Sequence, residues 1–518
     1  METRDLSTAA IAVIGAGTMG IGIAQLAAMH GHTTYLFDVD AAKSQAALAG
    51  LESLLAKRVE KGKMTQTLLD STLANLSIVT DINELAAVQM VVEAIVERQD
   101  IKQQLFIQLA DICANDTIFA SNTSSISITA IAAAVPNPER VVGLHFFNPA
   151  PVMKLVEIVR GLRTAPEITE GLFDLMRTWK KVPVTAKSTP GFIVNRVARP
   201  YYAEGFRALQ ENATTPAQLD FIMREVGGFA MGPCELTDLI GQDVNFSVTQ
   251  SVYQAFFYEP RYRPSLVQQE LVDAGCFGRK SGQGFYDHSQ TPKAPVYTLP
   301  SINVKDDVND DMNDKEMPTI IVRGEWQYAN GLVERLQAAD GLTVRLEAAD
   351  ESIIEIGEIS IRLSLGESVE IDHGDAKVML MDWQAEWTQA RAVVLAAAMT
   401  CDDNERALVA QVFARLGVSV IWTADHPGLY VLRTIAMLIN EGCEAVLHDI
   451  ASEADIDAAM KYGVNYPKGP FEWAALLGYD TVLSTLNNLQ RLYGEERYRA
   501  SLYLIKKAAT YRAASAYA

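Results

Sequence analysis

A glycine-rich turn near the N-terminus constrains the fold of this chain more than any other segment. The apolar run 11–14 leads into Gly15-Ala16-Gly17-Thr18-Met19-Gly20, and a helix-like stretch over 21–30 follows. In such a unit the first glycine permits a tight turn, the second lets the backbone approach a pyrophosphate, and the third lets helix and strand pack closely. Unpaired N–H groups at the start of the helix also favour an anion. The segment therefore predicts a dinucleotide-binding unit.

An acidic residue follows the second predicted strand, which covers 33–37. Asp38 can accept hydrogen bonds from both ribose hydroxyls of a dinucleotide and would repel a 2′-phosphate. The expected cofactor is therefore NAD rather than NADP. The sequence has no cluster of residues with metal-ligand spacing, so no metal is expected.

The order of predicted elements indicates two kinds of domain in the first half of the chain. Strand-like runs at 91–96, 117–120 and 141–144 alternate with helical stretches, which predicts an α/β Rossmann-type doubly wound sheet over residues 8–187. Helix periodicity then dominates, which predicts an all-α domain over residues 188–287. Residues 288–317 combine prolines with an acidic run and are predicted to form a linker.

The second half repeats parts of the first at a constant offset. Pro427-Gly428 follows Pro190-Gly191 by 237 residues, and Gly469-Pro470 follows Gly232-Pro233 by the same number. A constant offset over this span predicts a second all-α domain, over residues 426–510. Residues 318–425 are then expected to hold a degenerate Rossmann-like domain.

The repeat does not preserve the residues expected to be functional. At the same offset His145 becomes Asp382, Glu157 becomes Val394 and Asn195 becomes Leu432. The glycine-loop position, 322–329, keeps a single glycine, and its Trp326 and Tyr328 would obstruct a pyrophosphate. We therefore expect the second copy to bind no NAD and to perform no chemistry.

Composition narrows the classes of partner and the compartment. Against 44 basic residues stand 64 acidic ones, and the net charge of −20 argues against binding nucleic acid or anionic membranes. The five cysteines are scattered and show no CxxC spacing, which is typical of reduced thiols in a cytoplasm. No run is long enough for a transmembrane helix, and no signal peptide is visible. A cytoplasmic location is expected.

His145 and Glu157 are candidates for acid–base chemistry. His145 stands beside Phe146 and Phe147, and Glu157 follows it by twelve residues. A partly desolvated imidazole whose tautomer is fixed by a carboxylate is a suitable general base near neutral pH. For an isolated histidine, the alternative is a buried side chain that makes a structural hydrogen bond.

Four segments, together with 92–97 and 282–286, give the chain its resemblance to a known family. These segments are Gly15 to Gly20, Ser121-Asn122-Thr123-Ser124-Ser125, His145-Phe146-Phe147-Asn148-Pro149 and Thr189-Pro190-Gly191-Phe192-Ile193-Val194-Asn195-Arg196. As a set they resemble the NAD-dependent 3-hydroxyacyl-CoA dehydrogenases. The resemblance runs from about residue 8 to 288, and the helical part reappears at about 426–510.

The resemblance implies roles for individual residues. His145 would take the proton from the substrate 3-hydroxyl, and Glu157 would stabilise the imidazolium. Ser124 and Asn195 would bind the oxygen at C3 or the thioester carbonyl. Three further residues match positions near the cofactor, namely Glu97, Lys102 and Lys280. A contact to coenzyme A phosphates from the segment 57–63 is plausible, with no single residue indicated.

The implied activity is the oxidation of an L-3-hydroxyacyl-CoA by NAD⁺. The duplicated architecture is similar to the bacterial enzymes of aerobic phenylacetate catabolism, which oxidise 3-hydroxyadipyl-CoA. Oxidation of 3-hydroxybutyryl-CoA or of general fatty acyl-CoA is the alternative within the class. For the adipyl substrate, candidates to meet the distal carboxylate are Arg196, Arg199 and Arg207.

Two other hypotheses concern the role and assembly of the chain. A protein that keeps the fold without catalysis, as crystallins related to this family do, is the alternative to an enzyme. In the family the helical domain pairs subunits. The chain could therefore form a homodimer, or its second helical domain could imitate a dimer within one chain.

Overall fold

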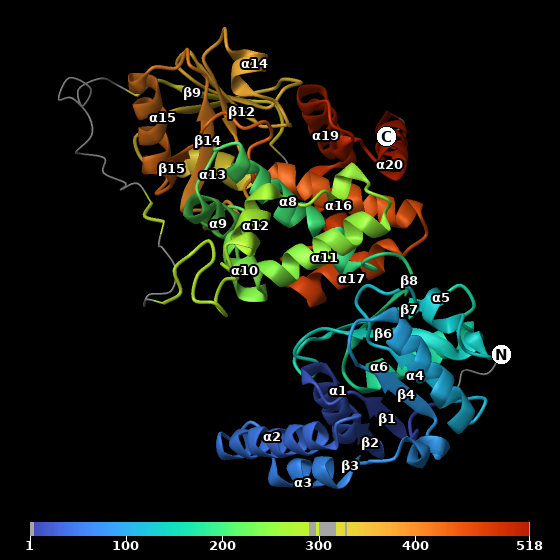
Figure 1. Ribbon diagram of the computed structural model, residues 1–518. Helices are drawn as coiled ribbons and strands as arrows, with labels where there is room; N and C mark the ends of the chain where they lie inside the picture. The colour runs from blue at the N-terminus through green and yellow to red at the C-terminus, as the bar shows by residue number, and fades with distance from the viewer. Residues whose placement is uncertain (1–4, 290–296, 300–316, 327–328, 517–518) are drawn as a thin grey trace. The chain divides into compact units, whose positions relative to one another are not determined.

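The computed structural model describes residues 5–289, 297–299, 317–326 and 329–516 (Figure 1). The contacts between Cα atoms divide the chain into two compact units. Unit 1 comprises Met1–Arg196 and His448–Asn465, and unit 2 comprises Val197–Leu447 and Tyr466–Ala518. Most of the predicted linker, and the predicted obstruction by Tyr328, lie outside the described residues.

Unit 1 is built on an eight-stranded sheet with the order β3-β2-β1-β4-β5-β6-β7-β8. The strands are β1 (Ile11–Ile14), β2 (Thr34–Phe37), β3 (Leu76–Ile78), β4 (Met90–Glu93), β5 (Ile118–Ser121), β6 (Val141–Phe146), β7 (Leu155–Arg160) and β8 (Val182–Lys187). Neighbouring strands run parallel except β6 and β7, which are antiparallel. The order from β3 to β6 is that of a doubly wound dinucleotide-binding sheet.

The central strands of this sheet are buried, and their residues are apolar except Glu93 at the end of β4 and Ser121 at the end of β5. All four residues of β1 are buried, as are all four of β4 and of β5. Such continuous apolar runs are expected where helices cover both faces of a parallel sheet. The helices of unit 1 before residue 190 are α1 (Thr18–Met29), α2 (Ala41–Glu60), α3 (Gln66–Ala74), α4 (Gln99–Ile112), α5 (Ile128–Ala132) and α6 (Pro166–Thr178).

A helix from the C-terminal half also belongs to unit 1. Helix α17 (Glu453–Val464) packs against β7 and β8, and Ile450, just before it, accepts a hydrogen bond from the N–H of Lys187 at 2.9 Å. The packing is close, since a Cβ added at Gly463 would lie 2.6 Å from the side chain of Leu155. The repeat in the sequence did not predict that α17, which lies in the second predicted all-α domain, would belong to unit 1.

Unit 2 contains helices from both predicted all-α domains. The helices of the first domain are α8 (Arg199–Gln210), α9 (Pro216–Glu225), α10 (Pro233–Ile240), α11 (Gln242–Ala255) and α12 (Leu266–Asp273). Those of the second are α16 (Val431–Leu447), α18 (Pro470–Leu477), α19 (Tyr479–Tyr493) and α20 (Leu502–Ala516). Helix α16 is buried over almost its whole length and packs against α8. A helix that is buried on every side is expected at the centre of such a bundle.

The turns that join the elements repeat as the sequence does. Gly191 and Gly428 have φ angles of 74° and 77°, and the residues after them, Phe192 and Leu429, have φ angles of 47° and 52°. The left-handed conformation is costly for residues with a Cβ, so its recurrence at the same offset marks a duplicated structure.

The second sheet, also in unit 2, has seven strands in the order β10-β9-β11-β12-β13-β14-β15. The strands are β9 (Ile320–Arg323), β10 (Val344–Glu347), β11 (Ile353–Ile356), β12 (Ile359–Leu363), β13 (Val378–Met381), β14 (Ala392–Ala397) and β15 (Ser419–Trp422), with helices α13 (Asn330–Ala338), α14 (Val369–His373) and α15 (Asp403–Arg415). Strand β11 runs antiparallel to both its neighbours, and β13 runs antiparallel to β14. The predicted fold class, two α/β parts and two all-α parts with the second α/β part degenerate, is therefore confirmed.

Candidate active site

The glycine loop between β1 and α1 leaves a surface open to a ligand. Gly15 has a φ of 103°, and a Cβ at Gly20 would lie 1.7 Å from the carbonyl oxygen of Gly15, so neither position accepts a side chain. A Cβ at Gly17 would meet nothing within 4 Å. Gly17 is the N-cap of α1, and no side chain caps that helix. Its first N–H groups are therefore available to a phosphate.

Asp38 lies at the carboxyl end of β2, next to the glycine loop. Its Oδ2 accepts a hydrogen bond from the N–H of Ala16 at 2.9 Å, and its Oδ1 accepts one from Asp40 at 3.0 Å. The two bonds hold the carboxylate beside the loop. Its position at the end of the second strand fits the ribose of a dinucleotide, and the open face of the loop fits the pyrophosphate.

His145 and Glu157 are direct partners across an antiparallel pair of strands. They face each other in the register of β6 and β7, and Nδ1 of His145 lies 2.6 Å from Oε2 of Glu157. The imidazole is only 6% exposed and lies against the rings of Phe147 and Phe192, at centroid distances of 4.5 and 5.8 Å. The neutral imidazole therefore carries its proton on Nδ1 and keeps a lone pair on Nε2.

The second oxygen of Glu157 fixes the carboxylate in place. Oε1 accepts hydrogen bonds from the N–H groups of Ile193 and Val194, both at 3.0 Å. Glu157 is fully buried, so a carboxylate with both oxygens occupied has little freedom to move. The same bonds tie Asn195, the next residue, to the strand that faces His145.

The serine-rich loop after β5 is organised by Glu97. Its carboxylate accepts hydrogen bonds from Oγ1 of Thr123 at 2.6 Å and from the N–H of Ser124 at 3.0 Å. Burial acts to raise the pKa of Glu97, but the charge of Lys102 and the hydrogen bonds outweigh it and lower that pKa. Ser124 is half-buried, and its hydroxyl has no partner among the described residues. The loop thus holds a free hydroxyl in a fixed backbone.

The ammonium group of Lys102 pairs with two carboxylates and does not face an open cofactor position. Its Nζ lies 2.6 Å from Oε1 of Glu93 and 3.2 Å from Oε2 of Glu97, and the side chain is 1% exposed. Glu93 also accepts hydrogen bonds from Oγ of Ser121 at 2.6 Å and from the N–H of Ile95 at 2.7 Å. Lys102 therefore supports the loop that carries Ser124 through Glu97.

Two residues that organise this site lie in the segments 92–97 and 121–125 but had no role predicted from the sequence. Glu93 is one, and its signal was an acid at the end of the apolar strand β4. Asn122 is the other; its Oδ1 accepts a hydrogen bond from the N–H of Phe146 at 2.8 Å and so joins the serine loop to the end of β6. No local pattern distinguishes such an asparagine from an ordinary turn residue.

Asn195 and Lys280 lie in different settings. Asn195 is half-buried in the short helix α7 (Val194–Val197), directly after the N–H groups that bind Glu157. Lys280 belongs to unit 2, where its ammonium lies 2.6 Å from the carboxylate of Asp243 and 47% of its side chain is exposed. Among the described residues, no group of acidic, histidine or cysteine side chains could hold a metal ion, and no helix is long and apolar enough to cross a membrane.

A dinucleotide loop and a histidine–carboxylate pair on one α/β sheet are typical of the nicotinamide-dependent dehydrogenases. Comparison with known proteins gives the family. Residues 10–189 match the model of the "3-hydroxyacyl-CoA dehydrogenase, NAD binding domain". Residues 191–288 and 428–515 match the C-terminal domain of the same enzymes, and 361–427 match a "3-hydroxybutyryl-CoA dehydrogenase reduced Rossmann-fold domain".

Individual relatives agree with these matches. The chain is 45% identical over 502 residues to the 3-hydroxyadipyl-CoA dehydrogenase of Escherichia coli (strain K12), covering 96% of this chain and 97% of that protein. The crystal structure of a 3-hydroxybutyryl-CoA dehydrogenase from Escherichia coli K12 has a TM-score of 0.86 and 43% identity, covering 98% of this chain and 99% of that one. The pig mitochondrial hydroxyacyl-coenzyme A dehydrogenase is 39% identical over 284 residues, 54% of this chain and 90% of its own.

The chain belongs to the 3-hydroxyacyl-CoA dehydrogenase family. It is an NAD-dependent oxidoreductase that converts a 3-hydroxyacyl-CoA to the 3-oxoacyl-CoA. The predicted cofactor, reaction class and acyl-CoA substrate are confirmed, and an enzyme rather than a non-catalytic protein is the outcome.

Proposed function

We propose that the protein oxidises 3-hydroxyadipyl-CoA to 3-oxoadipyl-CoA as a step of phenylacetate catabolism. The relative that is 45% identical is named for this activity, and the match covers 96% of this chain and 97% of that protein. The first half of the chain is the catalytic part, because His145 and Glu157 face each other there.

In this proposal His145 is the general base. The observation that carries it is the 2.6 Å contact between Nδ1 of His145 and Glu157, whose other oxygen is held by Ile193 and Val194. A fixed carboxylate on Nδ1 leaves Nε2 to accept the proton of the 3-hydroxyl and stabilises the positive charge that follows. The hydroxyl of Ser124 and the amide of Asn195 bind the substrate oxygens and stabilise negative charge as it develops.

The cofactor is held by the loop that joins β1 to α1. Gly15, Ala16, Gly17, Thr18, Met19 and Gly20 form the cradle, and Asp38 binds the ribose. Glu97 and Lys102 position the adjoining serine loop, and Lys280 is a further candidate for a cofactor contact. When bound, NAD⁺ accepts the hydride that leaves C3 of the substrate.

A second candidate substrate is 3-hydroxybutyryl-CoA. The solved structure with 43% identity over nearly the whole chain carries that name, as does the model matched by 361–427. Steady-state kinetics of NADH formation with the two thioesters distinguish them. A higher kcat/KM for the adipyl ester is expected, and a clear preference for the butyryl ester would overturn the adipyl proposal.

We further propose that the two helical domains imitate a dimer within one chain. Two buried groups of contacts in unit 2 support it. Oε2 of Glu204 lies 2.7 Å from Nε of Arg433 and accepts a hydrogen bond from the hydroxyl of Tyr498 at 3.2 Å. Glu441, 237 residues after Glu204, accepts one from Tyr262 at 2.6 Å. Each domain thus supplies a tyrosine to a buried glutamate of the other, as a two-fold interface would.

The domain boundaries follow the same organisation. We propose domains over 8–187, 188–287, 318–425 and 426–510, with a linker over 288–317, and a cytoplasmic location consistent with five cysteines that form no disulfide. The mass in solution tests the assembly. A monomer of 56.7 kDa is expected if the internal pairing replaces a subunit interface, and a stable homodimer through the same helices would contradict it.

A further inference from the structure

Three charged side chains beside the glycine loop leave one negative charge uncompensated. Nζ of Lys102 lies 2.6 Å from Oε1 of Glu93 and 3.2 Å from Oε2 of Glu97. Glu93 and Lys102 are buried, whereas 40% of the side chain of Glu97 is exposed. One ammonium cannot neutralise two carboxylates. Because its contact with Glu93 is the shorter one, the remaining charge resides mainly on Glu97.

No second cation offsets this charge. Among the described residues Lys102 is the only cation that pairs with Glu97, and the guanidinium of the next residue, Arg98, pairs with Asp100. The other partners of Glu97 are neutral hydroxyl and N–H groups of the serine-rich loop. Burial acts to raise the pKa of Glu97, but the charge of Lys102 and these hydrogen bonds outweigh it. Glu97 is therefore a carboxylate near neutral pH.

Glu97 lies on the part of the sheet that holds the second half of a dinucleotide. The segment after β4 runs beside the glycine loop: the N–H of Ala94 donates to the carbonyl of Ile14 at 2.8 Å, and a Cβ added at Gly15 would lie 2.5 Å from the carbonyl oxygen of Ala94. In a doubly wound sheet, β1 to β3 hold the adenosine half and the strands from β4 onward hold the other half. Glu97 follows β4 and is bonded to the loop after β5, so it belongs to the nicotinamide half.

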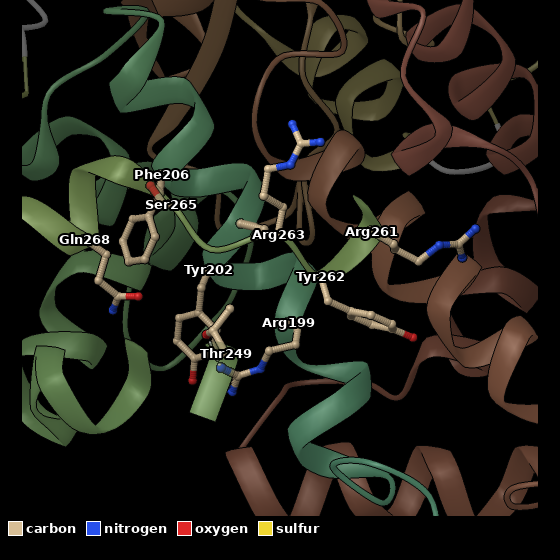
Figure 2. A pocket seen from close by; sticks show the side chains of 10 residues that line it. Arg199, Tyr202, Phe206, Thr249, Arg261, Tyr262, Arg263, Ser265 and Gln268 are labelled. Carbon is tan, nitrogen blue, oxygen red and sulfur yellow. Dashed lines mark hydrogen bonds between the residues drawn. The ribbon is translucent and has the colours of Figure 1, made fainter. Parts of the chain in front are cut away.

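An uncompensated charge acts on a ligand only where it meets an open surface. Arg199 in unit 2 is a contrasting case, since no carboxylate pairs with it among the described residues. It is 5% exposed, its Nη1 donates to Oγ1 of Thr249 at 2.9 Å, and its guanidinium is turned toward Thr249 and Tyr202 (Figure 2). These side chains cover the cation, whereas the carboxylate of Glu97 stays accessible beside the glycine loop.

The two redox forms of the cofactor differ in charge at one place, the nicotinamide ring, which is cationic in NAD⁺ and neutral in NADH. We propose that the carboxylate of Glu97 selects the oxidised form by favouring the binding of NAD⁺ over that of NADH. The carboxylate attracts the cationic ring and has no comparable attraction for the neutral one. In the direction of oxidation, this charge helps NAD⁺ to bind and NADH to leave. This role of Glu97 rests on the cofactor placement proposed above and is independent of the acyl group.

Binding of NAD⁺ and of NADH to the full chain, without acyl-CoA, tests this role. NADH is titrated by its fluorescence and NAD⁺ by calorimetry, and the ratio of the two dissociation constants is compared between variants. Glu97→Gln keeps the size of the side chain and an oxygen that accepts hydrogen bonds, but it loses the charge. Glu93→Gln leaves Glu97 in place and frees Lys102 to neutralise it. Asp38→Asn is the matched control, because it removes an equal charge beside the adenosine ribose, which is the same in both forms.

For Glu97→Gln we expect binding of NAD⁺ to weaken roughly five- to tenfold, with little change for NADH. Glu93→Gln should change the ratio in the same direction by a smaller factor, and Asp38→Asn should weaken both forms equally. Equal weakening of both forms by Glu97→Gln, or a ratio within about twofold of the wild type, would overturn the role of Glu97.

Thermal unfolding shows whether each variant is folded. If Glu97→Gln is not, the ratio in Glu93→Gln decides by itself, and a wild-type ratio there overturns the role of Glu97. A wild type that binds neither form would refute the cofactor placement and the role of Glu97 together. Neither result depends on which acyl-CoA the enzyme oxidises, so the proposed substrate is tested separately.

Discussion

A strand pair precedes each helical domain along the chain, and the two pairs use a buried carboxylate differently. In unit 1, His145 faces Glu157 across β6 and β7, and Glu157 accepts the N–H groups of Ile193 and Val194. In unit 2, Asp382 takes the place of the histidine and faces Val394, whose carbonyl accepts its N–H at 3.1 Å.

Asp382 performs the structural part of the task by itself. Its side chain accepts hydrogen bonds from the N–H groups at the start of α16, namely those of Tyr430, Val431 and Leu432, at 2.7–3.0 Å. Burial raises the pKa of Asp382 to about 6, against the lowering effect of these bonds. Unpaired N–H groups at a buried helix start need an acceptor, with or without catalysis.

Glu157 has two functions: it accepts hydrogen bonds from the N–H groups at a helix start, and it orients the imidazole of His145. The second copy keeps the acceptor for the helix start and loses the imidazole that the acceptor would orient. The second copy has also lost the glycine-rich loop, since a single glycine remains in the segment 322–329. Trp326, near the single remaining glycine, is 3% exposed and donates its indole N–H to the carbonyl of Arg323 at 3.1 Å. A buried indole there supports the expectation that the second copy binds no dinucleotide.

Removing the base should give the largest effect, confined to catalysis. In His145→Gln the side chain can still donate to Glu157 but cannot accept a proton. We expect kcat to fall roughly 10²–10⁴-fold with little change in Tm, measured by NADH formation and thermal unfolding. If kcat falls less than about tenfold, His145 is not the base.

Asp382→Ala is the counterpart in the second copy, and its effect should fall on stability. Four buried N–H groups, those of Trp383, Tyr430, Val431 and Leu432, would lose their acceptor. The free energy of unfolding should therefore drop by about 2–4 kcal/mol. Urea denaturation followed by circular dichroism measures it. The folded variant should keep the wild-type kcat, and a loss of kcat comparable to that of His145→Gln would show that the second copy takes part in catalysis.

The glycines of the loop allow a finer test. Gly17→Ala adds a methyl group that meets no protein atom within 4 Å. We expect normal Tm and a KM for NAD⁺ raised about tenfold, because the methyl group occupies the approach of the pyrophosphate. Gly324→Ala is the control in the second copy. A Cβ there would lie 2.4 Å from the carbonyl oxygen of Glu351, so it should lower Tm and leave that KM unchanged.

The smallest expected effect is a pH dependence of the free energy of unfolding, caused by a histidine near the start of the second helical domain. Burial, followed by the charge of Arg433, lowers the pKa of His426 to about 4. The unfolded chain therefore binds more protons between that value and the usual 6.5, and stability is lost as pH falls through this range. The expected loss from pH 7 to pH 5.5 is about 1 kcal/mol.

The variant His426→Gln checks this origin. Its free energy of unfolding should depend less steeply on pH over the same range, as followed by denaturation at several pH values. An identical pH dependence in variant and wild type would assign the effect to other groups.

Much of the site could be predicted from the sequence because local chemistry determines it. The tight turn at Gly15 and the close packing at Gly20 follow from the absence of a side chain, and both appear as expected. Strand β4 ends at Glu93, three residues before the end of the strand predicted over 91–96. Lys102 matched a position near the cofactor, but its burial between Glu93 and Glu97 depends on a helix and a loop that meet only in the folded chain.

The sequence by itself determined the dinucleotide loop, the choice of NAD and the duplication, and its resemblance to a known family indicated the reaction class. These depend on residue types at fixed short spacings and on a constant offset. Only the tertiary structure decided which carboxylate serves which helix start, that α17 packs on the first sheet, and that Arg199 has no counter-charge. Such pairings join residues far apart in the chain, and the burial that gives them their energy exists only after folding.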